Sequence, residues 1–146
     1  MDVEFKLDPN QAEPKITVTA AALTDEIKDL LLRLEHGRPT AITAIRSDRA
    51  VLLAPEHILR FFADGKAVSV QTAEGIFSVR QRLYELEKML DPHKFVRISH
   101  SEIVNLTHVT DLDLSLSGTI RMILTGNITC FVSRRCLKKI KQALDL

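Results

Sequence analysis

The sequence predicts a mostly β fold with short helices, built from antiparallel strands and preceded by a small ββα extension. Three observations lead to this prediction. From residue 40 onward, short apolar segments rich in β-branched residues follow one another. Turn-forming pairs such as Asp-Gly, Ser-Gly and Gly-Asn separate many of these segments. Only three stretches show the apolar spacing of a helix, and most connections are too short for crossovers between parallel strands.

The first 40 residues predict a ββα N-terminal extension. The segments VEFKL (3–7) and KITVTA (15–20) alternate as strands do, and DPNQAEP between them is typical of a turn. Residues 23–34 then carry apolar side chains at helical spacing, with Thr24 as N-cap and Gly37 as the stop. A unit this small buries little apolar area by itself. It therefore serves in dimerisation or regulatory docking, or it covers a sheet edge or the core of its own chain, and the sequence leaves these alternatives open.

Residues 42–146 predict one domain of short strands with a central and a closing helix. Strands are expected at 40–46, 49–55, 57–64, 66–72, 75–79, 94–99, 102–106, 108–116, 119–125 and 127–132. Between the fifth and sixth strands, the segment RQRLYELEKMLDP places Leu83, Leu86 and Leu90 on one face of a helix. The closing helix is expected to begin after Ser133, a good N-cap, and to direct Leu137 and Ile140 towards the core.

Charge is divided between the two ends of the chain. Residues 1–44 hold 5 basic and 8 acidic residues, a net charge of −3, whereas residues 45–146 hold 15 and 11, a net charge of +4. The closing helix gathers five cations without an intervening acid: Arg134, Arg135, Lys138, Lys139 and Lys141. Cations at a helix start are unfavourable unless an anion is bound there, because the free N–H groups already carry a partial positive charge. A solvated charged face is the simple alternative, but the absence of acids favours an external phosphate.

Other chemistry is excluded by spacing. Cys130 and Cys136 lie six residues apart, which matches no zinc-ligand pattern, and neither a disulfide nor a metal site is expected. No apolar run is long enough to cross a bilayer, so a cytoplasmic protein is expected. The chain has no Gly-rich phosphate loop and no serine with an evident base partner, so we expect neither an enzyme nor a cofactor nor a small-molecule substrate.

Two segments together resemble a known family. FVRISHSEIVNL (95–106) sets a short polar loop between apolar residues, and by itself it is typical of a strand connection. Followed by VSRRCLKKI (132–140), it resembles the LytTR family of bacterial DNA-binding domains, in which an F-x-R-I-H-R-S-like segment precedes I-V-N and an S-R-R-Y-like segment precedes K-x-L. RQRLYELEKMLDPHKF is similar to the short central helix of that family. The resemblance covers about residues 42–146.

The resemblance implies an elongated, mostly antiparallel β fold whose loops, rather than a recognition helix, enter successive major grooves of double-stranded DNA. It implies three contact regions: the loop around Asp64, Gly65 and Lys66, the Ser99 to Ser101 loop, and the start of the last helix. The implied DNA-contacting residues are Lys66, Arg97, Ser99, His100, Ser101, Ser133, Arg134, Arg135 and Lys138. Among these, His100 and Arg135 match positions that reach base edges. Phosphate contacts are expected for Arg97, Ser101, Arg134 and Lys138.

The chain departs from the family pattern at one of these positions. Where the family often has His-Arg, this chain has Ser99 and His100, and an imidazole is mostly neutral at pH 7. Weaker or pH-sensitive DNA binding is therefore expected.

The first 40 residues are too short for a response-regulator receiver, so the resemblance implies a stand-alone transcription regulator. Such a regulator is expected to act as a homodimer, because one module offers a small contact surface. In this family, small members of this kind are often held in check by a neighbouring membrane protein. The alternative function is an interaction module whose basic helix binds an acidic protein or a membrane surface.

Overall fold

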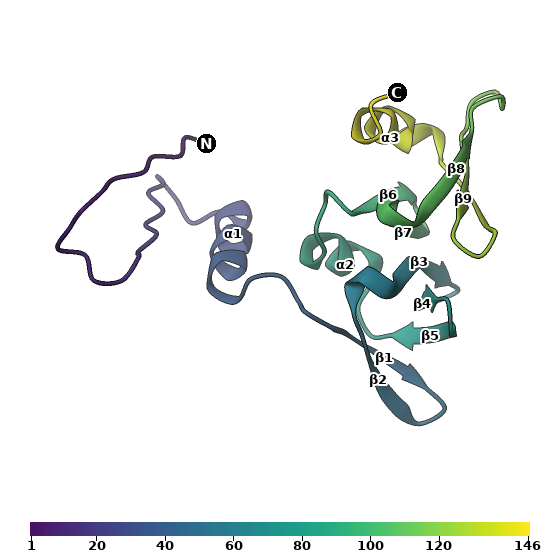
Figure 1. Ribbon diagram of the computed structural model, residues 1–146, viewed down its shortest axis with the longest axis horizontal. Coiled ribbons are helices and arrows are strands. Elements are labelled where there is room, and N and C mark those ends of the chain that lie inside the picture. Colours follow the sequence, from purple (N-terminus) through teal and green to yellow (C-terminus); the bar gives the residue numbers. More distant parts are fainter.

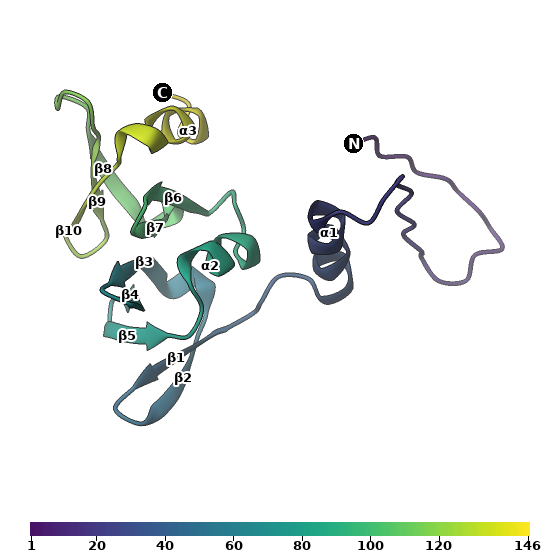
Figure 2. The ribbon, with the colours of Figure 1, turned by 180° about the vertical axis from the view of Figure 1, so that it is seen from behind.

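The computed structural model describes all residues, 1–146, and its body consists of two antiparallel sheets and two short helices (Figures 1 and 2). The strands of the larger sheet are β1 (Ile42–Arg46), β2 (Arg49–Leu53), β3 (Ile58–Asp64), β4 (Ala67–Thr72), β5 (Gly75–Val79), β6 (Phe95–Ser99) and β7 (Glu102–Asn105). The smaller sheet contains β8 (Val109–Asp113), β9 (Arg121–Leu124) and β10 (Ile128–Phe131). The helices are α1 (Asp25–His36), α2 (Leu83–Met89) and α3 (Leu137–Ala143). The predicted mostly β fold is confirmed.

The seven-stranded sheet has the order β2-β1-β5-β4-β3-β7-β6, and the three-stranded sheet has the order β10-β9-β8. All pairs are antiparallel, as the short turns predicted. β3 and β4 are joined by a tight turn in which Gly65 has φ 65°. That value lies in the left-handed region, which glycine adopts without a steric penalty. The Asp-Gly pair therefore places Lys66 at the tip of this hairpin.

The strands at one side of the larger sheet, β3, β7 and β6, bury both of their faces, so the body has two apolar cores. Successive side chains of a strand point to opposite faces. On β6, Phe95 belongs to the core under α2, whereas Val96 belongs to the core shared with the smaller sheet and α3. On β7, Ile103 and Val104 divide in the same way. Strands β3, β6 and β7 thus hold the two halves of the body together.

A buried asparagine fixes the end of β7. The Asn105 side chain donates to the Ile58 carbonyl at 2.9 Å and accepts from the Thr107 N–H at 3.1 Å. The Asn105 side chain is 1% exposed, and an unpaired polar atom is costly there. Asn105 therefore sets where β7 ends against β3.

The two body helices differ in how closely they follow the sequence prediction. α2 buries Leu83 and Leu86, and Leu90 follows them into the core, which confirms the predicted face. The closing helix does not begin directly after Ser133, as predicted, but at Leu137. A 3₁₀ turn, η3 (Arg134–Cys136), comes first, and α3 begins at Leu137. The Ser133 hydroxyl makes no capping bond, and the Ser133 carbonyl accepts from the Cys136 N–H at 3.0 Å, which is the i to i+3 bond of a 3₁₀ turn.

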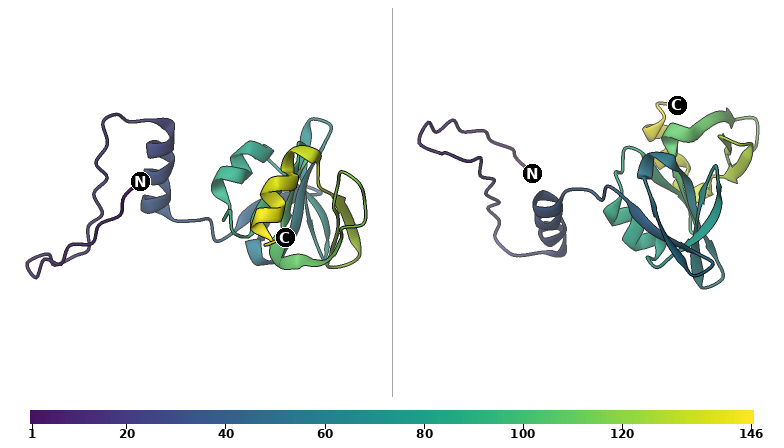
Figure 3. Two further views of the ribbon diagram at one scale, coloured as in Figure 1. Left: turned by 90° about the horizontal axis from the view of Figure 1, so that it is seen from above. Right: turned by 60° about the horizontal axis from the view of Figure 1, so that its bottom comes forward.

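The two strands predicted in the N-terminal extension are wrong for the single chain. Residues 1–24 form no strand, and residues 1–23 contain one backbone hydrogen bond, between Gln11 N–H and the Asp8 carbonyl. A hairpin of two strands is marginal in water without a third strand or a helix to pack on. The helix of the extension does form: Thr24 Oγ1 accepts from the Ile27 N–H, yet α1 buries none of its residues. Figure 3 shows the extension standing away from the sheets.

Candidate nucleic-acid interface

Two backbone hydrogen bonds bring the three predicted contact regions together. Ala63, next to the β3–β4 turn, donates its N–H to the Ser101 carbonyl at 2.8 Å. Ser133 donates its N–H to the Ile98 carbonyl, also at 2.8 Å. The β6–β7 loop therefore lies between the β3–β4 turn and η3. Residues 64–66, 99–101 and 133–135 are called the three-loop end below.

Most of the predicted contact residues at the three-loop end are free to meet a ligand. Exposed side chains belong to Lys66, His100, Ser101, Arg134, Arg135 and Lys138. None of them takes part in an ion pair of the chain. Ser99, Ser133 and Arg97 are half-buried. Exposed cations that form no internal ion pair attract an anion, because no bonded carboxylate neutralises them.

Arg97 is bound within the protein. Its Nε donates to the Ser99 carbonyl at 2.8 Å, and its Nη2 donates to the His100 carbonyl. Its Nη1 also lies 3.6 Å from Oε1 of Glu87 on α2. These contacts tie the loop carbonyls to the edge of the helix. Arg97 thus holds the loop that presents His100, and its contact with a phosphate stays a prediction.

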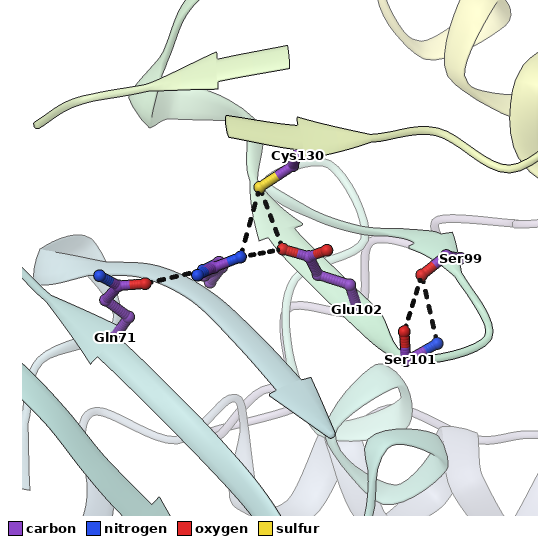
Figure 4. A network of polar contacts seen from close by, with 6 residues as sticks. Gln71, Ser99, Ser101, Glu102 and Cys130 are labelled. Carbon is purple, nitrogen blue, oxygen red and sulfur yellow. Dashed lines mark hydrogen bonds and ion pairs between the residues drawn. The ribbon is translucent and has the colours of Figure 1, made fainter. Parts of the chain in front are cut away.

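The two serines of the β6–β7 loop also bond to each other (Figure 4). Ser99 Oγ accepts from the Ser101 N–H at 3.2 Å and lies 3.3 Å from Ser101 Oγ. Such a side-chain turn replaces part of the backbone pairing that ends at Ser99. The loop is short and bonded on both sides, so His100 projects from a constrained position at its tip.

A polar cluster underlies the β6–β7 loop and joins the two sheets (Figure 4). Glu102, the first residue of β7, accepts from Nη1 of Arg60 at 2.6 Å and from the thiol of Cys130 at 3.0 Å. Arg60 also donates from Nε to the Gln71 side chain at 2.7 Å. The side chains of Arg60 and Glu102 are 20% and 14% exposed. The cluster therefore holds β3, β4, β7 and β10 in place beneath the loop.

The thiol of Cys130 in this cluster has low reactivity at neutral pH. Burial, together with the neighbouring Glu102 carboxylate, raises the pKa of the Cys130 thiol to about 12. The thiolate, the form that attacks electrophiles or binds metals, is therefore scarce at neutral pH. Cys130 and Cys136 are both free thiols, and no group of three or more His, Cys, Asp or Glu residues could hold a metal ion.

The turn between β8 and β9 lies beside η3. A Cβ atom added at Gly118 would stand 3.3 Å from Nε of Arg134, so the Arg134 side chain lies against this turn. Hydrogen bonds from Ser115 and the charge of Arg121 hold the pKa of the nearby Asp113 carboxyl below its usual range. Arg135 has no such neighbour and points its charge to solvent.

Sequence reasoning missed one cation at the three-loop end and took no account of two others. Val79 pairs with Val68, so exposed Arg80 follows β5 beside the β3–β4 turn. The RQR stretch (80–82) is part of the segment that the sequence predicts as a helix, and the cross-strand register that places Arg80 is not visible in the sequence. Arg46 and Arg49 face each other across the β1–β2 hairpin, next to Gly75 at the opposite end of the sheet.

Comparison with known proteins agrees with this architecture. The family profile of the LytTr DNA-binding domain matches residues 48–145. Two proteins of Staphylococcus aureus, from strains NCTC 8325 / PS 47 and COL, are each named an uncharacterized HTH-type transcriptional regulator. Both are 31% identical over 147 residues, covering 100% of this chain and 99% of their own. A solved LytTr DNA-binding domain of a putative methyl-accepting/DNA response regulator from Bacillus cereus superposes with a TM-score of 0.72 at 19% identity. That match covers 74% of this chain and 99% of the other.

These matches define a bacterial DNA-binding protein of the transcription-regulator class. The chain belongs to the LytTR family, and the predicted resemblance is confirmed. The family consists of DNA-binding regulator domains rather than enzymes. In this chain, β1–β5 separate α1 from α2 and β6–β10 separate α2 from α3, so it contains no helix-turn-helix. None of its helices has the length and apolarity needed to span a membrane.

Proposed function

We propose that this chain is a sequence-specific transcription regulator that reads DNA through the three-loop end. The observation that carries the proposal is the pair of backbone bonds, Ala63 to Ser101 and Ser133 to Ile98, which places Lys66, His100 and Arg135 on adjoining loops. At this end a 3₁₀ turn follows β10, and α3 begins only at Leu137, so loops and a turn stand in front of the helix. Loops held in fixed relative positions can enter neighbouring grooves of a duplex.

The residues divide into those that read bases and those that position the protein. Arg135 is exposed and unpaired, and its fork-shaped guanidinium matches O6 and N7 of guanine. His100 projects from the central loop towards a second base position. The cations Lys66, Arg80, Arg134 and Lys138, with the Ser101 hydroxyl, bind phosphates, which fixes register without reading sequence. Arg97 acts through the loop that it holds.

A mobility-shift experiment tests this function directly. A duplex is selected from a random library with the full-length protein, and its binding is then measured against a scrambled competitor. Arg135→Ala is expected to lose about 1–3 kcal/mol of binding and to narrow the gap between selected and scrambled duplexes. Arg49→Ala is the matched control, because it removes an exposed arginine at the opposite end of the sheet. Equal loss in both variants, or equal competition by scrambled DNA, would contradict the proposal.

One observation favours a second function. Lys138, Lys139 and Lys141 are exposed on α3 and carry no ion pair, so this helix also suits an acidic protein or an anionic membrane surface. The main proposal, in contrast, places the chain in the bacterial cytoplasm as a DNA-binding regulator. It includes an inhibitory membrane protein that docks on the chain. Binding to anionic vesicles with affinity similar to that for the selected duplex would favour the second function.

A further inference from the structure

The N-terminal extension exposes apolar side chains that its own chain does not cover. On α1, Leu34 is 45% exposed, and Leu23, just before the helix, is 63% exposed. With Ile27 and Leu30, these residues are spaced as one helical stripe. The polar contact between α1 and α2 is a surface ion pair, Asp29 to Lys88 at 3.8 Å, and surface pairs contribute little to stability. Ile27 and Leu30 are half-buried, and Leu23 and Leu34 at the ends of the stripe are exposed without a partner.

The segment before α1 has the same property. Val3, Phe5, Leu7 and Ile16 are between 71% and 93% exposed. They stand in alternating stretches whose backbone N–H and C=O groups are almost all unpaired. A segment that alternates in this way can form a strand when another strand or a helix packs against it. A second molecule can supply that strand or helix.

We propose that the N-terminal extension is the surface through which two copies of this chain associate, with α1 of one copy packed antiparallel against α1 of the other. A two-fold interface brings residue i of one copy to residue j of the other and the reverse. In the antiparallel arrangement, Glu26, which flanks the apolar stripe in the first turn, meets Arg33, which flanks it on the same side in the last turn of the partner helix. This charge pattern is complementary to itself, which favours a second copy over an unrelated partner.

The exposed apolar area is sufficient for a stable pair. A Val, Leu, Ile or Phe side chain removes about 100 Å² from water when fully buried. Weighted by their exposed fractions, the six side chains named above as exposed supply roughly 450 Å² per copy. A standard interface buries about 800 Å² per partner, of which a little over half is apolar. The extension meets that requirement without using the DNA-binding body.

The extension lies outside the matched family region but is shared with relatives. Residues 1–47 lie outside the matched family region. The Staphylococcus aureus relatives nevertheless match this chain over its whole length, so they share the extension. The inference does not rest on the proposed DNA contacts, because association is measured without DNA.

The test is the mass of the full-length protein in solution, followed by sedimentation across the micromolar range without DNA. We expect the mass of two chains, and a shift to one chain in Leu23→Asp/Leu34→Asp. Leu52→Asp is the matched control, because Leu52 is an exposed leucine of β2, 72% accessible, and its variant should remain a dimer. Circular dichroism confirms that each variant keeps its fold, since none of these side chains is buried.

A charge exchange tests the antiparallel geometry. Arg33→Glu is expected to weaken association, because it faces Glu26 of the other copy, and the double variant Glu26→Arg/Arg33→Glu is expected to restore it. A wild-type chain that stays monomeric throughout, with the extension either open to hydrogen exchange or protected on its own body, would overturn the proposal. So would a dimer that survives Leu23→Asp/Leu34→Asp unchanged, since its interface then lies elsewhere.

Discussion

Replacing Glu102 by glutamine tests whether the polar cluster beneath the β6–β7 loop supports the three-loop end. The substitution keeps the size of the side chain but removes the charge that accepts from Arg60 at 2.6 Å and from Cys130 at 3.0 Å. A hydrogen bond to a charged group contributes about 1.5–3 kcal/mol, and breaking a fully buried pair costs about 3–5 kcal/mol. The 14% and 20% exposure of the pair lets water replace part of the loss. We expect Glu102→Gln to lower the free energy of unfolding by about 2 kcal/mol.

Urea unfolding followed by circular dichroism measures this change. A loss of that size moves the midpoint by about 1 M at the slopes usual for a domain of this size. Adding Arg60→Gln and the double variant closes a mutant cycle, in which the two residues should couple by about 1 kcal/mol or more. Arg121→Gln, which breaks the more exposed ion pair with Asp113 at 2.7 Å, is the control and should cost less. Additive effects of Arg60→Gln and Glu102→Gln would refute the reasoning.

The same substitution should also reach DNA binding, because Glu102 follows Ser101 directly in the chain. Loosening the start of β7 frees the loop whose carbonyl accepts from Ala63. The variant must then order this loop when it binds DNA, at a cost in conformational entropy. The wild-type protein has already ordered the loop on folding. Affinity for the selected duplex should therefore fall at temperatures where Glu102→Gln is still folded. Unchanged affinity would show that the cluster stabilises the body without positioning the loop.

Three further predictions concern single side chains. Lys138→Ala should lower the slope of log affinity against log salt by about 0.9. Arg97→Gln should weaken binding because it frees the loop that Arg97 holds, and a slope lowered by about 0.9 as well would support its predicted phosphate contact. In the wild type, affinity for DNA at fixed salt should rise as pH falls from 8 to 5.5, because a protonated imidazole is attracted to DNA, and it should stay constant in His100→Ala. A wild-type affinity that does not change with pH would contradict a DNA contact by His100. In native protein at pH 8, iodoacetamide should label Cys136 faster than Cys130, whose raised pKa keeps it a thiol, with the two rates converging in urea. Equal labelling rates of the two cysteines in the native protein, measured by peptide mass spectrometry, would show that Cys130 is not protected.

The strands and turns of the body were predictable because their signals are local. A hairpin is determined by alternating apolar residues in its two strands and by a turn pair such as Asp64 and Gly65 between them. All of these residues lie within a short stretch of the chain. The face of α2 followed from the spacing of Leu83, Leu86 and Leu90 for the same reason. The family motifs then supplied the identity of the candidate loops.

What the sequence could not supply depends on contacts between distant residues. Arg60 and Glu102 are 42 positions apart, and no local pattern indicates that they meet. Arg80 reaches the three-loop end only through the register of β4 with β5. The segments 3–7 and 15–20 show the opposite case. Alternation indicates that a segment suits a sheet, but a strand also needs an edge to pair with, and these segments pair with none of the sheet edges of their own chain.

Association through the N-terminal extension and DNA binding through the three-loop end are expected to reinforce each other. The three loops of one body form a small contact surface for DNA. Specific protein–DNA interfaces usually bury more protein surface than a single module of this size provides. Joining two bodies makes the second binding event intramolecular, which raises affinity without any new contact to DNA. Leu23→Asp/Leu34→Asp should therefore lose affinity for a duplex with two selected sites and keep the wild-type affinity for a duplex with one. If both duplexes lose affinity equally, the extension acts on the DNA-binding body itself, because a change confined to association leaves the single-site contacts intact.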